Sequence, residues 1–165
     1  MSAELLAIVT GPVSAEALTA RVQAAAAGTI AEGCGALASF VGVVRATHQG
    51  RHVRYLEYEA FAPLAVKVFR RIADEAAEEW PASVLGIVHR TGRLEVGEAS
   101  VAIVAAAAHR AQAFAVCRYA IERVKQIAPV WKHEFFDDGE AWVEGAVANP
   151  DDAEARRVAR TRACA

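Results

Sequence analysis

The chain has 165 residues, 55% of them hydrophobic, and a formal net charge of −2. This length and composition suit one domain with an ample core, and the charge lacks the basic excess typical of nucleic-acid-binding proteins. Residues 3–9 lack the basic start of a signal peptide, and the apolar stretch 101–108 is far shorter than the ~20 residues of a membrane span. We therefore expect a soluble cytoplasmic protein without nucleic-acid or membrane partners.

The first half of the chain contains four predicted elements. They are a strand at 5–10, a helix from Ser14 to about Ala27, and strands at about 35–45 and 53–60. Ser14 is a favourable helix N-cap and Gly28 a favourable helix end. The polar segment 46–52 contains Gly50 and is predicted to be a turn or a mobile connection.

The second half predicts two longer helices and two pairs of strands. The elements are a helix from Pro63 to Trp80, strands near 84–90 and 98–108, a helix from Ala111 to about Ile127, and a hairpin of Trp131–Phe136 and Ala141–Val147. Residues 91–97, with Gly92 and Gly97, are predicted to form a turn between the middle strands. In the second helix Phe114, Cys117, Ile121 and Val124 recur at helical spacing and predict its buried stripe.

Strands that arrive in adjacent pairs favour a largely antiparallel sheet with packed helices. The predicted class is therefore α+β rather than a doubly wound fold. Residues 1–148 are assigned to one domain. Residues 149–165 are a polar C-terminal tail, either a short helix or a loose segment, to which no function is assigned.

Lys125 and Lys132 lie on either side of Pro129. Because proline lacks an amide hydrogen and disfavours helical backbone in the residue before it, the helix must end between the two lysines. Their amines can then point at one place from two different elements. At the edge of the core, desolvation and the like charge of Arg118 would favour the neutral, reactive amine of Lys125. Alternatively, Lys125 only lays its stem on apolar surface and keeps its ammonium in water.

The apolar strand 101–108 ends at His109 and Arg110, where the next helix begins without a Ser, Thr, Asp or Asn cap. A helix N-terminus prefers an anion, so its amides, His109 and Arg110 could together hold a phosphate or carboxylate. The alternative is a polar corner without function. Arg45, at the end of the strand 35–45, leaves the same choice between a solvated terminus and an anion pocket.

The cysteines and paired glutamates give weaker signals. Cys34, Cys117 and Cys164 form no Cys-x-x-Cys pair, so neither a zinc site nor an internal redox couple is predicted, and any sulfur chemistry would need imported sulfur. The odd number of cysteines favours a reducing compartment. Glu57 and Glu59 could suggest acid–base catalysis, but such strand charges more often lie at an edge or an interface.

Seven motifs, in the same order, resemble those of the large, catalytic subunits of molybdopterin synthase. They are Ser39–Arg45, Leu56–Phe61, Val88–Leu94, Gly97–Glu98, Ala108–Phe114, Lys125 with Pro129–Glu134, and Gly139–Glu144. Each motif is short, but the resemblance spans roughly residues 5–144, most of the chain. The chain is thereby identified as a member of this family.

The resemblance implies a function, a fold and partners. Such subunits convert cyclic pyranopterin monophosphate (precursor Z) to molybdopterin, using the C-terminal Gly-Gly thiocarboxylate of a small ubiquitin-like subunit as the sulfur source. An α/β-hammerhead type of fold and a homodimer carrying two small subunits, a heterotetramer, are implied, and no metal or other cofactor. Lys125 and Lys132 would be the catalytic lysines. The substrate would be bound by these lysines and by Val43, Val44, Arg45, His109, Arg110, His133 and Glu134.

Three positions depart from the family pattern. His133 replaces a second basic residue, so its charge depends on pH. Ala46 stands where an acidic or amide residue is common, and Phe61 where tyrosine is frequent. Two other classes stay open: a Schiff-base lysine lyase, which borohydride would trap on its substrate without a partner, and a non-catalytic anion-binding or pterin-binding scaffold, whose role would survive Lys125→Ala.

Overall fold

A computed structural model describes residues 5–143, 145–146 and 148–165. They form two sheets and four helices, and most strand pairs are antiparallel, which confirms the predicted α+β class. The first sheet has the order β1 (Leu6–Val9), β5 (Val84–Arg90), β7 (Ala99–Ala107) and β2 (Ala36–Val43). Only β1 and β5, within this sheet, run parallel.

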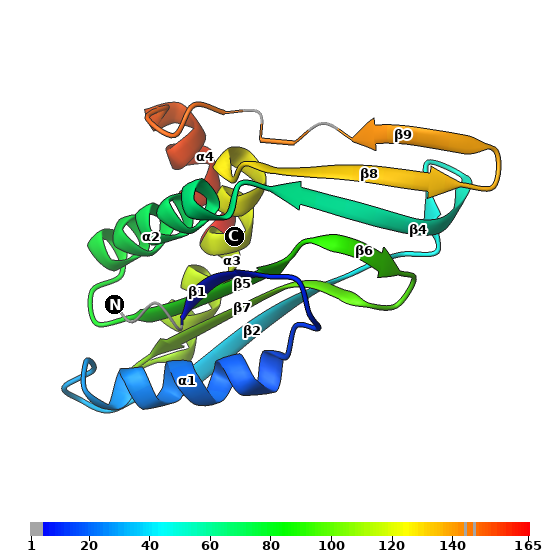
Figure 1. Cartoon of the computed structure of the whole chain (residues 1–165). Coiled ribbons are helices and arrows are strands. Elements are labelled where there is room, and N and C mark those ends of the chain that lie inside the picture. The colour runs from blue at the N-terminus through cyan, green and yellow to red at the C-terminus, as the bar shows by residue number, and fades with distance from the viewer. Residues whose placement is uncertain (1–4, 144, 147) are drawn as a thin grey trace.

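The second sheet is antiparallel and projects to one side of the first (Figure 1). Its order is β3 (Thr47–His48), β4 (Arg51–Ala60), β8 (Val130–Phe136) and β9 (Gly139–Val143), with β6 (Gly92–Glu95) also paired to β4. The register places Tyr58 opposite Lys132 and Leu56 opposite Glu134. Because side chains alternate along a strand, these residues share one face of the sheet.

The helices enclose the first sheet. α1 (Ala15–Ala27) covers one face, while α2 (Ala62–Glu79) and α3 (Arg110–Ile127) lie on the other (Figure 1). The main core lies in these layers, since the central strand β7 is buried along its whole length after Ala99. Gly86 permits close packing of α1, because a Cβ there would approach Val22 and Leu18 to 2.7 and 2.8 Å.

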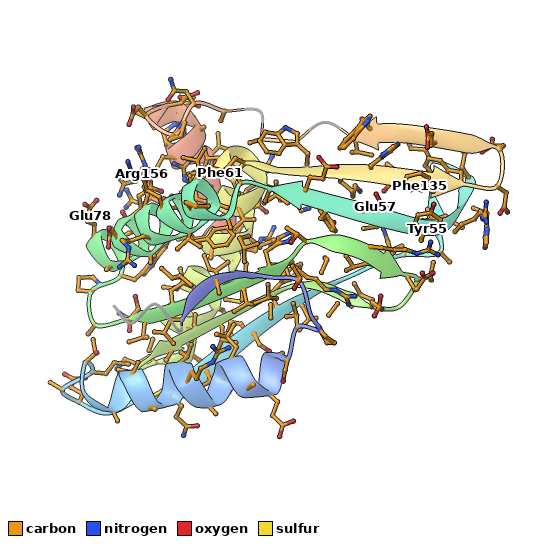
Figure 2. All side chains as sticks on the ribbon, in the orientation of Figure 1. Tyr55, Glu57, Phe61, Glu78, Phe135 and Arg156 are labelled. Atoms are coloured by element: carbon orange, nitrogen blue, oxygen red, sulfur yellow. The ribbon has the colours of Figure 1, made fainter. Side chains whose placement is uncertain are left out.

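The C-terminal segment is a helix rather than a loose tail. α4 (Ala153–Ala163) is capped by Asp152 and buries Ala159 completely in the main core. It lies beside α3, and Arg156 of α4 contacts Glu78 of α2 at 2.8 Å (Figure 2). The division into a domain of residues 1–148 and a tail remains a prediction.

A buried ion pair connects α2, α3 and the segment before α4. Arg123, with no exposed surface, donates from Nε and Nη2 to the two carboxylate oxygens of Glu75 at 2.8 and 2.9 Å. Tyr119 donates to the same carboxylate at 2.8 Å, and Arg123 also reaches the Pro150 carbonyl at 3.3 Å. Burial works against the ionised form of Glu75, but these hydrogen bonds outweigh it and hold its pKa below the usual value.

Most predicted elements are confirmed, with three local differences. The segment 46–52 is a tight hairpin of β3 and β4, whose turn uses positive φ angles at Gln49 and Gly50. The supposed turn after Arg90 contains β6. The last hairpin strand is Gly139–Val143 rather than 141–147, and residues 144 and 147 lie outside the described part of the chain.

Phe114 was wrongly predicted to face the core. It is 67% exposed, because the preceding residue, Ala113, occupies the buried face of α3 in its place. That face is formed by Ala113, Val116, Cys117, Ala120, Val124 and Ile127. Small residues such as Ala113 and Ala120 let α3 approach β2 and β7 closely, which an apolar-stripe argument based on large residues overlooks.

Candidate active site

A cavity of about 470 Å³ lies where β2, the second sheet and the end of α3 meet. Its polar and charged lining residues are Arg45, Thr47, His48, Tyr58, His89, Ser100, Lys125, Lys132 and Glu134. Apolar side chains of β2, β4, β7, α3 and β8 complete the wall. Among the described lining residues Glu134 is the one carboxylate, so the cavity carries an excess of positive charge and suits an anionic ligand.

Both predicted lysines line this cavity. α3 ends at Ile127, the backbone of Ala128 is extended just before Pro129, and β8 begins at Val130. Lys125 therefore lies in the last turn of α3 and Lys132 on the following strand, as the proline predicted. Two separate elements bring the amines to one space.

The lysines differ in their surroundings. Partial burial lowers the pKa of Lys125, and the positive charges of Lys132 and Arg45 lower it further. The positive charge of Lys132 is balanced by Glu134, because Lys132 Nζ lies 2.6 Å from Glu134 Oε1. Lys125 has no such carboxylate contact among the described residues, so its ammonium loses a proton more easily to give the neutral amine.

Glu134 is the buried centre of a small polar cluster. Glu134 is 3% exposed, and its carboxylate oxygen Oε2 lies 2.5 Å from Nδ1 of His48. Burial alone would raise the pKa of this carboxyl, but the hydrogen bonds from Lys132 and His48 prevail and lower it. Glu134 is therefore an anion that orients two neighbouring cationic or polar groups.

The segment Val43–Arg45 reaches the cavity through an irregularity at the end of β2. The register with β7 shifts between Gly42 and Val43: Gly42 lies opposite Val101 and Val43 opposite Ala99, so Ser100 of β7 is the extra residue of this irregularity. The Val44 amide donates to the Glu98 carbonyl at 3.0 Å, which fixes the redirected backbone. All three predicted residues, Val43, Val44 and Arg45, line the cavity.

His133 faces away from the cavity. It stacks on Trp142 with ring centroids 4.4 Å apart and also contacts Phe135, which in turn stacks on Tyr55 (Figure 2). The period of two residues in a strand could have predicted this, because Lys132 and Glu134 necessarily point opposite to His133. Glu57 lies on the same outer face, opposite His133, and does not line the cavity.

His109 and Arg110 are also absent from the cavity wall. His109 is the residue before α3 and makes no side-chain capping bond, and Arg110 is exposed at the first turn. Lys125 lies fifteen residues after Arg110, or about 22 Å along a helix axis. Within one chain these two residues cannot share a small ligand with Lys125.

His48, Tyr58 and His89 line the site but were not predicted as functional residues. His89 is 5% exposed, and its Nδ1 lies 2.8 Å from the Arg90 carbonyl, an acceptor that assigns the proton to Nδ1. Burial lowers the pKa of His89 to about 4 despite that hydrogen bond, with a smaller effect from Lys125. Its remaining nitrogen is therefore a neutral acceptor. Tyr58 and His89 lie within the motifs Leu56–Phe61 and Val88–Leu94, which was a signal for them, whereas His48 lies in none of the seven motifs.

The depressed pKa of His89 predicts a pH-dependent stability. Folded His89 binds a proton only near pH 4, whereas the unfolded side chain does so near 6.5. Stabilisation is therefore full above about pH 6.5 and is lost as the pH falls towards 4. Between pH 7 and 4 the wild type should lose about 3 kcal/mol more unfolding free energy than His89→Gln. Urea titrations at several pH values measure this difference, and parallel curves for the two proteins would contradict it.

The fold and cavity define an α+β protein with a positively charged cavity lined by lysine and arginine. Residues 8–127 match the family model described as "MoaE protein", so the chain belongs to the MoaE family. It is 44% identical to "Molybdopterin synthase catalytic subunit" of Halalkalibacterium halodurans over 109 residues, which cover 66% of this chain and 70% of the relative. The Staphylococcus aureus protein of that description is 44% identical over 114 residues, covering 69% and 77%.

Solved structures agree with this assignment. Molybdopterin synthase from Staphylococcus aureus superposes with a TM-score of 0.77 at 38% identity, covering 87% of this chain and 98% of that one. The MoaE protein from Burkholderia ambifaria gives a TM-score of 0.71 at 36% identity, covering 92% and 95%. The predicted family is thus confirmed, and with it the assignment to the enzymes of molybdenum cofactor biosynthesis.

Two further observations concern the described residues alone. None of their helices combines the length and apolar character needed to cross a membrane. Within the same residues, no group of three or more His, Cys, Asp or Glu side chains is placed to hold a metal ion. Cys34, Cys117 and Cys164 are free, and burial raises the pKa of Cys117 to about 11, which keeps its thiol protonated.

Proposed function

We propose that this chain is the sulfur-transferring catalytic subunit of a molybdopterin synthase. It would convert cyclic pyranopterin monophosphate to molybdopterin with two sulfurs from the C-terminal thiocarboxylate of a small ubiquitin-like subunit. The observation that carries the proposal is the meeting of Lys125, Lys132 and Arg45 around one cavity. The names of the curated relatives support the same reaction.

The charges of the cavity match the needs of such a reaction. Arg45 supplies a guanidinium for the substrate phosphate. Lys125, whose pKa is lowered, is the better candidate for proton transfer or nucleophilic attack at neutral pH. Lys132, paired with Glu134, would hold charge and orientation while Lys125 reacts.

Two kinds of partner belong to the proposal. A solved structure with a similar fold, from Helicobacter pylori, is described as a complex of subunits 1 and 2 of molybdopterin-converting factor, which supports a small partner subunit here. A second copy of this chain would bring His109 and Arg110 to the site that they cannot reach within one chain. The edge strand β2, with Val41 39% and Val43 51% exposed, offers apolar surface for such a homodimer, a heterotetramer once two small subunits bind.

A single-turnover assay tests the function. The chain is mixed with precursor Z and a thiocarboxylated small subunit, and dithiolene formation is followed over time. Rapid formation that requires both reactants is the expected result. Borohydride trapping of the substrate without any partner would instead indicate a Schiff-base lyase. Tight binding of the pterin phosphate without turnover, in the presence of a competent small subunit, would indicate a scaffold.

A further inference from the structure

His48 occupies a position in the cavity that its sequence context did not suggest. It belongs to the two-residue strand β3, held against β4 by pairing with Arg51. Its side chain is 24% exposed, and Nδ1 lies 2.5 Å from Oε2 of Glu134. The turn at Gln49 and Gly50 fixes the hairpin, so the imidazole is presented by ordered backbone rather than by a loose loop.

Glu134 connects His48 to Lys132. Its two oxygens are divided between them, with Oε1 2.6 Å from Lys132 Nζ and Oε2 2.5 Å from His48 Nδ1. The carboxylate is buried, so water can do little to weaken either contact. Any change of charge on one partner must therefore alter the attraction that the carboxylate exerts on the other.

We propose that His48 is a positioning residue that controls, through Glu134, how firmly Lys132 is held. This inference deepens the function proposed above and rests on it. When His48 takes up a proton, the carboxylate serves two cations, and its pull on the Lys132 ammonium weakens. The Lys132 ammonium then turns towards a bound anion more readily. When His48 is neutral, Lys132 is the one charged partner in contact with the Glu134 carboxylate among the described residues.

The other charged groups around the cavity do not provide this response. Arg45, at the end of β2, contributes a guanidinium, a group that does not release its proton in proteins. Burial keeps His89 of β5 neutral, with a pKa of about 4, and raises the pKa of Tyr58 of β4. Lys125 of α3 is an amine with a lowered pKa, not an imidazole. On β8, Glu134 has a lowered pKa and stays ionised, and Lys132 is the residue whose position Glu134 controls. An imidazole, by contrast, ordinarily changes charge between pH 5 and 8.

Two asparagine variants test the proposal. Asparagine at position 48 keeps an N–H donor for Glu134 but cannot be protonated. His52→Asn is the matched control, because His52 lies on the same hairpin, is exposed, pairs with Asp137 at 2.9 Å and does not line the cavity. The ratio of the wild-type single-turnover rate to that of His48→Asn should be at least about threefold larger at pH 6 than at pH 8.5. His52→Asn should follow the wild-type profile.

A measurement without turnover separates this inference from the proposed function. The side-chain ¹³Cε resonance of Lys132 should show a small inflection at the pH where the His48 ring titrates. His48→Asn should abolish that inflection, and His52→Asn should retain it. An inactive wild type that keeps the inflection would refute the proposed function and leave the coupling intact. Coincident rate profiles together with no inflection in the wild type would overturn the role of His48.

Discussion

Replacing either Lys125 or Lys132 by alanine should lower the single-turnover rate of dithiolene formation by at least about 100-fold. Lys125→Ala removes the amine with the lowered pKa, and Lys132→Ala also leaves the buried carboxylate of Glu134 without its ammonium partner. Because the two side chains reach one cavity from separate elements, neither can replace the other. The measurement is the rate with saturating precursor and thiocarboxylated small subunit.

The chain contains a matched control for both variants. Lys67 is exposed on α2 and does not line the cavity, so Lys67→Ala should retain the wild-type rate. Lys125→Arg and Lys132→Arg separate charge from proton transfer, since arginine keeps the cation but does not release its proton. Full activity of Lys125→Ala in a folded protein would contradict its role as the reactive amine. Equal losses in Lys67→Ala would mean that the assay reports overall charge rather than the site.

The largest effect on stability is expected at the buried ion pair of Arg123 and Glu75. Arg123→Ala leaves an ionised carboxylate buried with only Tyr119 and the partly exposed Arg71 as donors. Breaking a buried pair from one side typically costs about 3–5 kcal/mol, a large part of the total stability of a domain. Urea denaturation at pH 7 should therefore show a strongly lowered midpoint. The contact between α4 and the rest of the chain should weaken too, because Arg123 also reaches the Pro150 carbonyl.

An exposed ion pair on α4 provides the comparison. Arg157 and Glu154 are three residues apart, and both side chains are 65% exposed. Solvent screens such a pair, so Arg157→Ala should leave the urea midpoint almost unchanged. If Arg123→Ala were no more destabilising than Arg157→Ala, the network would not stabilise the packing of α2, α3 and α4.

Local sequence predicted which elements carry the two lysines better than it predicted the residues around them. Pro129 predicted that the helix carrying Lys125 ends before Lys132, and the structure agrees. The histidines were harder to interpret. His133 was expected beside the substrate but faces the opposite side of β8, whereas His48 and His89, which received no role, line the cavity. For His133, the alternation of side chains along β8 would have given the orientation. For His48 and His89, no neighbouring residue identifies the cavity that they face.

The sequence by itself determined the order and kind of the main elements, because proline, glycine and helical or strand periodicity act over a few neighbouring residues. It also determined the family, through motifs that keep their order. Only the tertiary structure decided that Glu134 joins Lys132 to His48, that Arg123 pairs with Glu75, and that Phe114 is exposed. The ion pairs and the closely packed face of α3 depend on strand register and helix packing between residues distant in sequence. Such positions are fixed when the core forms as a whole.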